Sequence, residues 1–223
     1  MGQNQAVATD RPTFRRRGQD VAVIVVGFAI LALTAIPIDA RSVGALETDI
    51  FRLVNDLPGA IYGVVWPLMQ LGNVIVAPVL ALVALITRRF RLAAGIALSG
   101  FGVWLLAKVI KDLVERGRPA ELLDEVFRRG APRVGQGYPS GHAAVAVAIA
   151  VVISPYLSRP LKVVAWVLAA AVCVGRVYVG AHLPLDVLGG AAFGLAIGAL
   201  CNLALGAPET RPAEAGNERY VAR

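Results

Sequence analysis

The feature that most constrains this chain is a series of long apolar segments with almost no charge. A membrane-spanning helix needs about 20 mostly apolar residues. Several segments approach or exceed that length, among them residues 21–38 and 183–205. The mean hydropathy of +0.66 is also well above the balance of a soluble globular domain. The bilayer is therefore the first solvent to consider.

These segments predict an all-α integral membrane bundle with about six transmembrane helices. The spans are predicted at residues 21–38, 59–86, 92–110, 141–157, 161–179 and 183–205. Pro67 and Pro78 interrupt the second span and predict a kink there. Residues 42–57 carry apolar side chains at helical spacing, which predicts a short helix along the membrane interface. We expect one domain, residues 20–206, between a flexible cytoplasmic tail at 1–19 and a disordered tail at 207–223.

The positions of Lys and Arg predict the orientation of the bundle. The N-terminal tail and the turns after the second and fourth spans are basic, so both termini are expected in the cytoplasm. The net charge of +7 does not indicate a nucleic-acid partner, because the cations sit in short clusters between apolar runs. One external segment departs from the charge rule, and an anionic substrate would explain it. Its cations are Lys111, Arg116, Arg118, Arg128, Arg129 and Arg133.

Polar residues at the ends of the predicted spans fall into three clusters. The clusters are Lys111 with Arg118-Pro119, then Pro139-Ser140-Gly141-His142, then Arg176 with His182 and Asp186. With six alternating spans, all three emerge on the same external face. Ionisable groups in a membrane are costly and usually line a functional site. The sequence therefore predicts one shared site at this face.

The second cluster has the features of an anion site. Ser140 is a candidate N-cap, Gly141 permits close approach to the backbone, and the free amides of the helix start attract negative charge. Lys111, Arg118 and Arg176 would add three cations, and the arginine forks suit phosphoryl oxygens. A bound phosphate is the expected ligand. Arg116, Arg128, Arg129 and Arg133 would either contact a second phosphate or lipid headgroups, or belong to a solvated loop.

Both histidines of the chain belong to these clusters. His182 and Asp186 are four residues apart, so on a helix the carboxylate can orient the imidazole. This makes His182 the candidate nucleophile, with a phosphohistidine intermediate. His142 would protonate the leaving oxygen and later activate water. No grouping of side chains has the spacing of a metal site, so neither a metal nor another cofactor is expected.

The three motifs resemble the signature motifs of the type 2 phosphatidic acid phosphatase family. They read Lys111-x6-Arg118-Pro119, Pro139-Ser140-Gly141-His142 and Arg176-x5-His182-x3-Asp186. The resemblance implies a helical bundle, metal-independent hydrolysis, and the roles given above to these residues. It also implies kinship with polyprenyl-diphosphate phosphatases, phosphatidylglycerophosphate phosphatases and vanadium haloperoxidases. One departure is Gly175, where the family usually has Ser; we do not expect it to abolish activity.

The leading hypothesis is a lipid phosphatase of the cytoplasmic membrane, with its active site on the extracytoplasmic face and polyprenyl diphosphate as first-choice substrate. The enzymatic alternative is a phosphatidic acid or phosphatidylglycerophosphate phosphatase with the same mechanism. The non-enzymatic alternative is a transporter or binding protein for an anionic lipid. The expected partners are the lipid substrate and the bilayer, while the oligomeric state stays open.

Overall fold

The computed structural model describes residues 13–208, and its regular structure is almost entirely helical. The long helices are α1 (Gly18–Ala35), α5 (Phe90–Val114), α7 (Gly141–Ile153), α8 (Arg159–Tyr178) and α9 (Pro184–Leu205). The shorter ones are α2 (Ala45–Asn55), α3 (Tyr62–Met69), α4 (Val76–Ile86) and α6 (Pro119–Leu122), with 3-10 turns η1 (Gly59–Ile61), η2 (Gln70–Gly72) and η3 (Ser154–Tyr156). Two short strands, β1 (Phe14–Arg15) and β2 (Ala207–Pro208), pair antiparallel.

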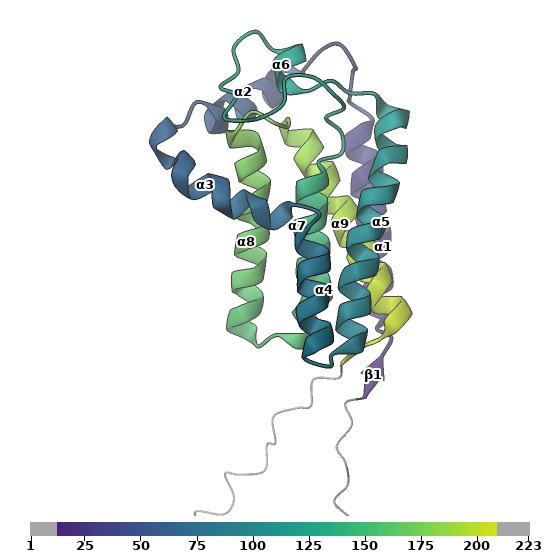
Figure 1. Ribbon diagram of the computed structural model, residues 1–223. Coiled ribbons are helices and arrows are strands. Elements are labelled where there is room, and N and C mark those ends of the chain that lie inside the picture. The colour runs from purple at the N-terminus through teal and green to yellow at the C-terminus, as the bar shows by residue number, and fades with distance from the viewer. Residues whose placement is uncertain (1–12, 209–223) are drawn as a thin grey trace, which may run out of the picture.

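The long helices run side by side, with α7 between α5, α8 and α9 (Figure 1). At the upper end of Figure 1, α5 and α8 finish while α7 and α9 begin, and α2 and α6 lie across this end. At the lower end lie β1 and the turn between α4 and α5. The chain thus brings the ends of four long helices together at the upper end.

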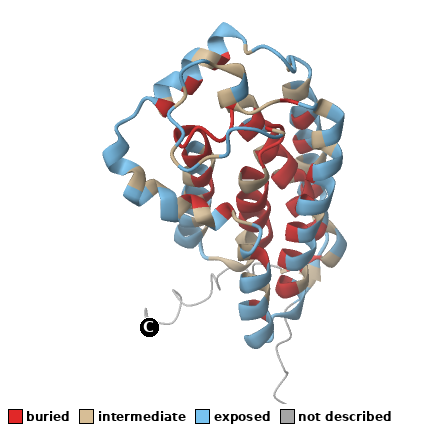
Figure 2. Cartoon of the chain, turned by 45° about the horizontal axis from the view of Figure 1, so that its top comes forward, coloured by how far each residue is buried: buried red, intermediate tan, exposed pale blue. Residues whose placement is uncertain are grey.

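Helix α7 forms the centre of the bundle because its residues are small and apolar on every side. Residues 143–152 are all buried, and Figure 2 shows this inner region in red. Helix α9 approaches it closely through glycines: a Cβ at Gly194 would lie 2.3 Å from the carbonyl oxygen of Ala144. One turn away on either side, a Cβ at Gly190 would lie 2.4 Å from the Ser140 carbonyl oxygen and one at Gly198 would lie 2.8 Å from Val151 Cβ. This spacing of small residues allows two helix backbones to pack in contact.

Within residues 13–208, four helices are long and apolar enough to cross a membrane: Gly18–Ala35, Phe90–Leu122, Arg159–Tyr178 and Pro184–Leu205. A fifth candidate is the bent pair Gly59–Gly72 and Val76–Ile86, whose axes meet at 65°. The kink predicted for residues 59–86 is therefore present. The apolar helix Gly141–Tyr156 is shorter than the others. These elements confirm an all-α bundle with four or five candidate spans, where the sequence predicted about six.

The segment predicted to lie along the interface is helical and amphipathic. Glu47, Phe51 and Asn55 form its buried stripe, while the side chains of Leu46 and Leu53 are each 75% exposed on the other face. Most of the two predicted tails lies outside the described residues. In the parts that are described, β1 pairs with β2 and α1 begins at Gly18.

Candidate active site

The three polar clusters converge at the upper end of the bundle. Lys111 lies in the last turn of α5, Arg176 in the last turn of α8, and Asp186 in the first turn of α9. Gly141 and His142 begin α7, which starts at the same end. The structure therefore brings together all the site residues that the sequence predicts: Lys111, Arg118, Ser140, Gly141, His142, Arg176, His182 and Asp186.

Hydrogen bonds to backbone join the three motifs. The Lys111 Nζ donates to the carbonyl oxygen of Gln136 at 2.8 Å, in the loop before α7. Arg118 Nη1 donates to the carbonyl oxygen of Ala181 at 2.9 Å, directly before His182. The backbone amide of Ser140 donates to the Asp186 carbonyl oxygen at 2.9 Å. These contacts fix the relative positions of segments that lie far apart in sequence.

His182 and Asp186 form the pair that their spacing predicts. The His182 Nδ1 lies 3.6 Å from the Asp186 Oδ2, and the residues are 3% and 0% exposed. That distance is slightly beyond a hydrogen bond, but it sets which ring nitrogen faces the carboxylate. Burial, followed by the charges of Arg176, Arg118 and Lys111, lowers the pKa of His182 well below its usual range. The imidazole is therefore neutral near pH 7, as a nucleophile must be.

Arg116 and Glu47 belong to this site, although the sequence did not assign either residue to it. Arg116 is 1% exposed and contacts Glu47 with both terminal nitrogens, at 3.1 and 2.6 Å. Its Nη1 also donates to the Asp186 Oδ1 at 3.1 Å. The solvated-loop alternative is wrong for Arg116, which links Glu47 of α2 to Asp186. The buried stripe on α2 was the available signal, since it places Glu47 one turn before Phe51.

Arg129 also has a structural role. Its Nη1 donates to the carbonyl oxygens of Asn55 and Tyr178 at 2.8 and 2.7 Å, and its Nη2 to that of Leu57 at 2.8 Å. The guanidinium therefore ties α2 to the end of α8 and is not part of a solvated loop. Arg128 and Arg133 are exposed, as the solvated-loop alternative expects.

Buried polar atoms without a hydrogen-bond partner are concentrated in the site. Within residues 13–208 there are six such side-chain atoms, and four belong to predicted site residues. They are Arg118 Nε, Arg176 Nε, Ser140 Oγ and His182 Nδ1. Each unpaired group costs about 1–3 kcal/mol, and most buried polar groups are paired. Phosphate oxygens would pair well with the hydroxyl and the two guanidinium donors.

Ser140 differs from its predicted role. It occupies the N-cap position of α7, but its side chain makes no capping hydrogen bond. The first amides of α7 therefore donate no hydrogen bond to this hydroxyl. The Oγ and the helix start are both available to an anion. A Cβ built at Gly141 would meet nothing within 4 Å, so the backbone here borders open space.

An apolar cavity adjoins this open space. It has a volume of about 300 Å³, and its lining includes Lys111, Gly141 and His142 together with Val74 and Trp104. A second cavity of about 440 Å³ shares Val74 and Trp104 and continues between α4 and α5. Both of these shared side chains are 43% exposed. The polar site thus communicates with the lipid-facing surface.

Gly175, which stands where the family usually has Ser, lies at a close contact between α8 and α3. A Cβ at this position would lie 3.1 Å from Val65 Cγ1 and 3.3 Å from Met69 Cβ. The Sδ of Met69 also accepts a hydrogen bond from Arg176 Nη1 at 3.6 Å. Helix α3 therefore packs closely against α8 at Gly175 and contacts the neighbouring arginine.

A helical bundle with a buried imidazole and carboxylate, three site cations and a helix start facing open space is the arrangement expected of a membrane phosphatase. The comparison with known families agrees. Residues 74–207 match the PAP2 superfamily, and the chain belongs to it.

Two named relatives are phosphatases. Phosphatidylglycerophosphatase B of Bacillus subtilis is 38% identical over 103 residues, which cover 41% of this chain and 47% of that protein. The chain thus spans about half the length of this relative. Undecaprenyl-diphosphatase of Sulfolobus acidocaldarius is 26% identical over 170 residues, covering 75% of this chain and 82% of that protein. Together with the family match, these homologues indicate a lipid phosphate hydrolase.

Two solved structures are similar. Aquifex aeolicus LpxE superposes with a TM-score of 0.61 and 29% identity, covering 71% of this chain and 95% of that one. The first transmembrane PAP2-type phosphatidylglycerolphosphate phosphatase from Bacillus subtilis gives a TM-score of 0.60 and 24% identity, covering 82% and 94%. The second likeness concerns the fold alone. The fold is that of a multi-pass membrane protein.

Proposed function

We propose that this chain hydrolyses a lipid phosphate or diphosphate through a phosphohistidine intermediate at the upper end of the bundle. The carrying observation is the group of partnerless buried atoms on Arg118, Ser140, Arg176 and His182. They come from all three motifs and surround the pair formed by His182 and Asp186. A phosphoryl group would pair with the Arg118 and Arg176 guanidiniums and the Ser140 hydroxyl, and would bring phosphorus to the imidazole.

In the proposed first step, His182 Nε2 attacks phosphorus, because Nδ1 faces Asp186. The bond from phosphorus to the leaving oxygen breaks, and His142 gives a proton to that oxygen. Asp186 stabilises the positive charge that develops on the His182 ring. Lys111, Arg118 and Arg176 stabilise the charge on the equatorial oxygens.

In the second step, His142 takes a proton from water, which attacks the phosphohistidine. The bond between nitrogen and phosphorus breaks, inorganic phosphate leaves, and His182 returns to its neutral form. Arg116 and Glu47 take no proton in this scheme. They hold the Asp186 carboxylate that orients the ring.

The first-choice substrate is polyprenyl diphosphate. The undecaprenyl-diphosphatase relative aligns with 75% of this chain, including residues beyond the motifs. The second candidate is phosphatidylglycerophosphate or phosphatidic acid, supported by the higher identity of 38% to the phosphatidylglycerophosphatase over a shorter match. In both cases the apolar chain would occupy the two cavities bordered by Val74 and Trp104.

The proposal places the chain in a cytoplasmic membrane with six spans. Helix α7 and η3 would add one more span to the five candidates, because they run from the upper to the lower end within the bundle. Their shorter length is compatible with this because α7 is buried among other helices. The basic turns at the lower end favour the cytoplasm for that end. The active site would then face outward, where polyprenyl carriers are recycled.

The decisive experiment measures phosphate release by the purified chain from polyprenyl diphosphate, phosphatidylglycerophosphate and phosphatidic acid. We expect kcat/KM to be highest for polyprenyl diphosphate. His182→Ala should abolish release from every lipid while the protein remains folded. His142→Ala should lower phosphate release strongly, because His142 acts in both steps.

Lys108→Gln is the matched control, because Lys108 lines the cavity but its Nζ lies over the Trp104 ring at 3.5 Å. It should retain most of the activity. Full turnover by His182→Ala would exclude His182 as the nucleophile. Saturable headgroup binding without any phosphate release would instead favour the anionic-lipid transporter or binding protein.

A further inference from the structure

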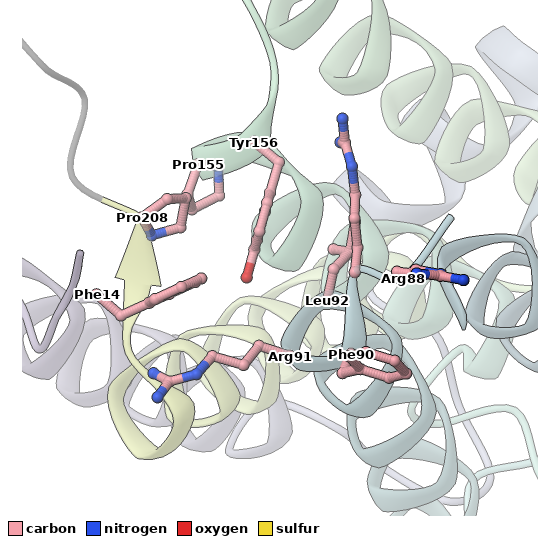
Figure 3. A pocket seen from close by; sticks show the side chains of 9 residues that line it. Phe14, Arg88, Phe90, Arg91, Leu92, Pro155, Tyr156 and Pro208 are labelled. Atoms are coloured by element: carbon pink, nitrogen blue, oxygen red, sulfur yellow. The ribbon is translucent and has the colours of Figure 1, made fainter. Parts of the chain in front are cut away.

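A third cavity, lined by arginines, lies at the lower end of the bundle. It shares no residue with the proposed active site. Its volume is about 610 Å³, and β1, β2, η3 and the first turn of α5 contribute to it. Figure 3 shows Phe14, Pro155, Tyr156 and Pro208 on one side and Arg88 on the other. The proposed phosphatase mechanism does not use this cavity.

Among the described residues, three arginines line the cavity and no acidic residue does. Arg88 and Arg89 come from the turn between α4 and α5, and Arg91 comes from the first turn of α5. Arg91 is held in place, since its Nη1 donates to the carbonyl oxygen of Leu205 at 2.9 Å and its guanidinium lies 4.3 Å from the Phe14 ring centroid. Three like charges around one cavity repel each other, and a bound anion would relieve that repulsion.

The backbone around the cavity also favours a bound anion. Arg88 has a positive φ of 57°, which is a strained conformation for a side chain other than glycine. Helix α5 begins at Phe90 with no side-chain cap and no acidic residue in its first turn. The start of this helix therefore adds positive potential to that of the three guanidiniums.

The walls of the cavity favour an anion that carries an apolar body. Phe14, Leu92 and Tyr156 line the cavity beside the arginines. Phe90 also lines it and is 63% exposed, and Ile86 on the preceding turn is 72% exposed. The apolar surface therefore continues from the cavity onto the outer face of the bundle, which faces lipid.

The preference for Lys and Arg on the cytoplasmic side of membrane proteins explains why cations gather at this end. It does not explain a cavity that combines three guanidiniums with aromatic walls. We propose that this cavity binds the phosphate headgroup of an anionic membrane phospholipid, with its acyl chains along Phe90 and Ile86. Basic pockets between spans on the cytoplasmic side are suited to such headgroups.

The test measures lipid binding by the full chain in detergent, using phosphatidylglycerol, phosphatidylcholine and inorganic phosphate as separate probes. Native mass spectrometry reports bound lipid, and thermal unfolding reports the stabilisation that binding provides. The test variant is Arg88→Gln with Arg89→Gln, which leaves the contacts of Arg91 intact. The matched control is Arg159→Gln with Lys162→Gln, which removes the same charge from the next turn at the lower end.

We expect phosphatidylglycerol to bind the parent chain and the control at least tenfold more tightly than the test variant. The rise in unfolding temperature that phosphatidylglycerol causes should be smaller in the test variant only. The unfolding temperature without lipid should be the same in all three proteins. An equal loss in the control, or equal binding of phosphatidylcholine, would overturn the proposal. So would full displacement by inorganic phosphate, which would indicate a site for the free ion. Binding is read without catalysis, so the result does not depend on the proposed phosphatase activity.

Discussion

The charge of Arg116 is buried, so it would be costly without both of its acidic partners, Glu47 and Asp186. The guanidinium is 1% exposed and lies between Glu47 and Asp186. Removal of one partner from such a buried group typically costs about 3–5 kcal/mol. The Glu47 Oε1 also accepts a hydrogen bond from the amide of Leu185 at 2.9 Å. The Asp186 carboxylate is thus positioned by Arg116 and, through it, by Glu47, and neither residue touches substrate in the proposed mechanism.

We predict that Arg116→Lys lowers kcat about 10- to 100-fold, or about 1.4–2.8 kcal/mol of activation free energy. A single ammonium group is unable to hold both Glu47 oxygens and Asp186, so the His182 ring loses its orientation. KM should change little, because Arg116 does not bind phosphate. Steady-state kinetics on the preferred lipid measure both constants, with the exposed Arg128→Lys as control.

Glu47→Gln gives an independent test of the same contact. Gln keeps an acceptor for Leu185 but loses the charge that pairs with Arg116. Its effect on kcat should combine with that of Arg116→Lys in a markedly non-additive way. An unchanged kcat in both folded single variants would remove Arg116 and Glu47 from the positioning of Asp186.

The low pKa of His182 predicts how stability depends on pH. Its causes are burial, then Arg176, Arg118 and Lys111, with Asp186 and His142 also nearby. In the unfolded chain His takes up a proton below about pH 6.5, whereas the folded state keeps this ring neutral. The unfolded state then binds more protons, so stability falls with falling pH, by at most about 1.4 kcal/mol per pH unit for this group.

His182→Asn should therefore lose less stability than the parent chain between pH 7.5 and 5.5. Unfolding of both proteins in the same detergent measures the difference. Identical pH dependence would mean that His182 keeps an ordinary pKa in the folded protein.

The motif residues were predictable from sequence, whereas Arg116 and Glu47 were not. Spacing placed His182 beside Asp186, and alternating spans placed three motifs at one end. The contact between Arg116 and Glu47 joins residues 69 positions apart. No periodic pattern specifies such a pair, because it depends on how α2 lies over the bundle.

At the scale of elements, the interface between α7 and α9 positions two of the three motifs. Ser140 precedes α7, and Asp186 lies in the first turn of α9. The glycines at 190, 194 and 198 let the backbones of the two helices touch below the site. A small displacement along this interface would therefore move Ser140 and His142 relative to His182.

Gly194→Ala should lower both the unfolding temperature and kcat. Its Cβ would lie 2.3 Å from the Ala144 carbonyl oxygen, so the helices must separate. Gly102→Ala is the matched control in α5, since its Cβ would meet only the Ile197 Cγ2 at an ordinary 3.5 Å. The control should be neutral or more stable by up to about 1 kcal/mol, because alanine favours helix. A Gly194→Ala protein as stable and active as the control would show that the interface adapts freely.

The sequence predicted the long helices better than the short ones. Apolar runs located α1, α5, α8 and α9 to within a few residues at most ends, and the prolines predicted the kink near η2. Helix α6 has only four residues and was not predicted. The oblique packing of α3 against α8 depends on contacts at Gly175 that run length does not record.

At the scale of the whole molecule, the cations of the two ends have different environments. At the upper end, Arg116 and Arg129 are occupied by carboxylates or backbone oxygens, and Lys111, Arg118 and Arg176 surround the proposed phosphate site. These contacts account for most of the cations in the external segment that departed from the charge rule. At the lower end, Arg88 and Arg89 lie in the turn between α4 and α5, and Arg159 and Lys162 lie in the first turn of α8. The lower-end cations are therefore the better guide to orientation.

This distribution predicts that the upper end faces outward in a cell. The test places a single cysteine at either end of a chain in which Cys173 and Cys201 are replaced by Ala. Arg128→Cys at the exposed upper loop should react with a membrane-impermeant maleimide in intact cells. Arg159→Cys at the lower turn should react only after permeabilisation. The opposite pattern would place the active site in the cytoplasm, and the carrier lipid of the outer face would no longer be the favoured substrate even if His182 remained the nucleophile.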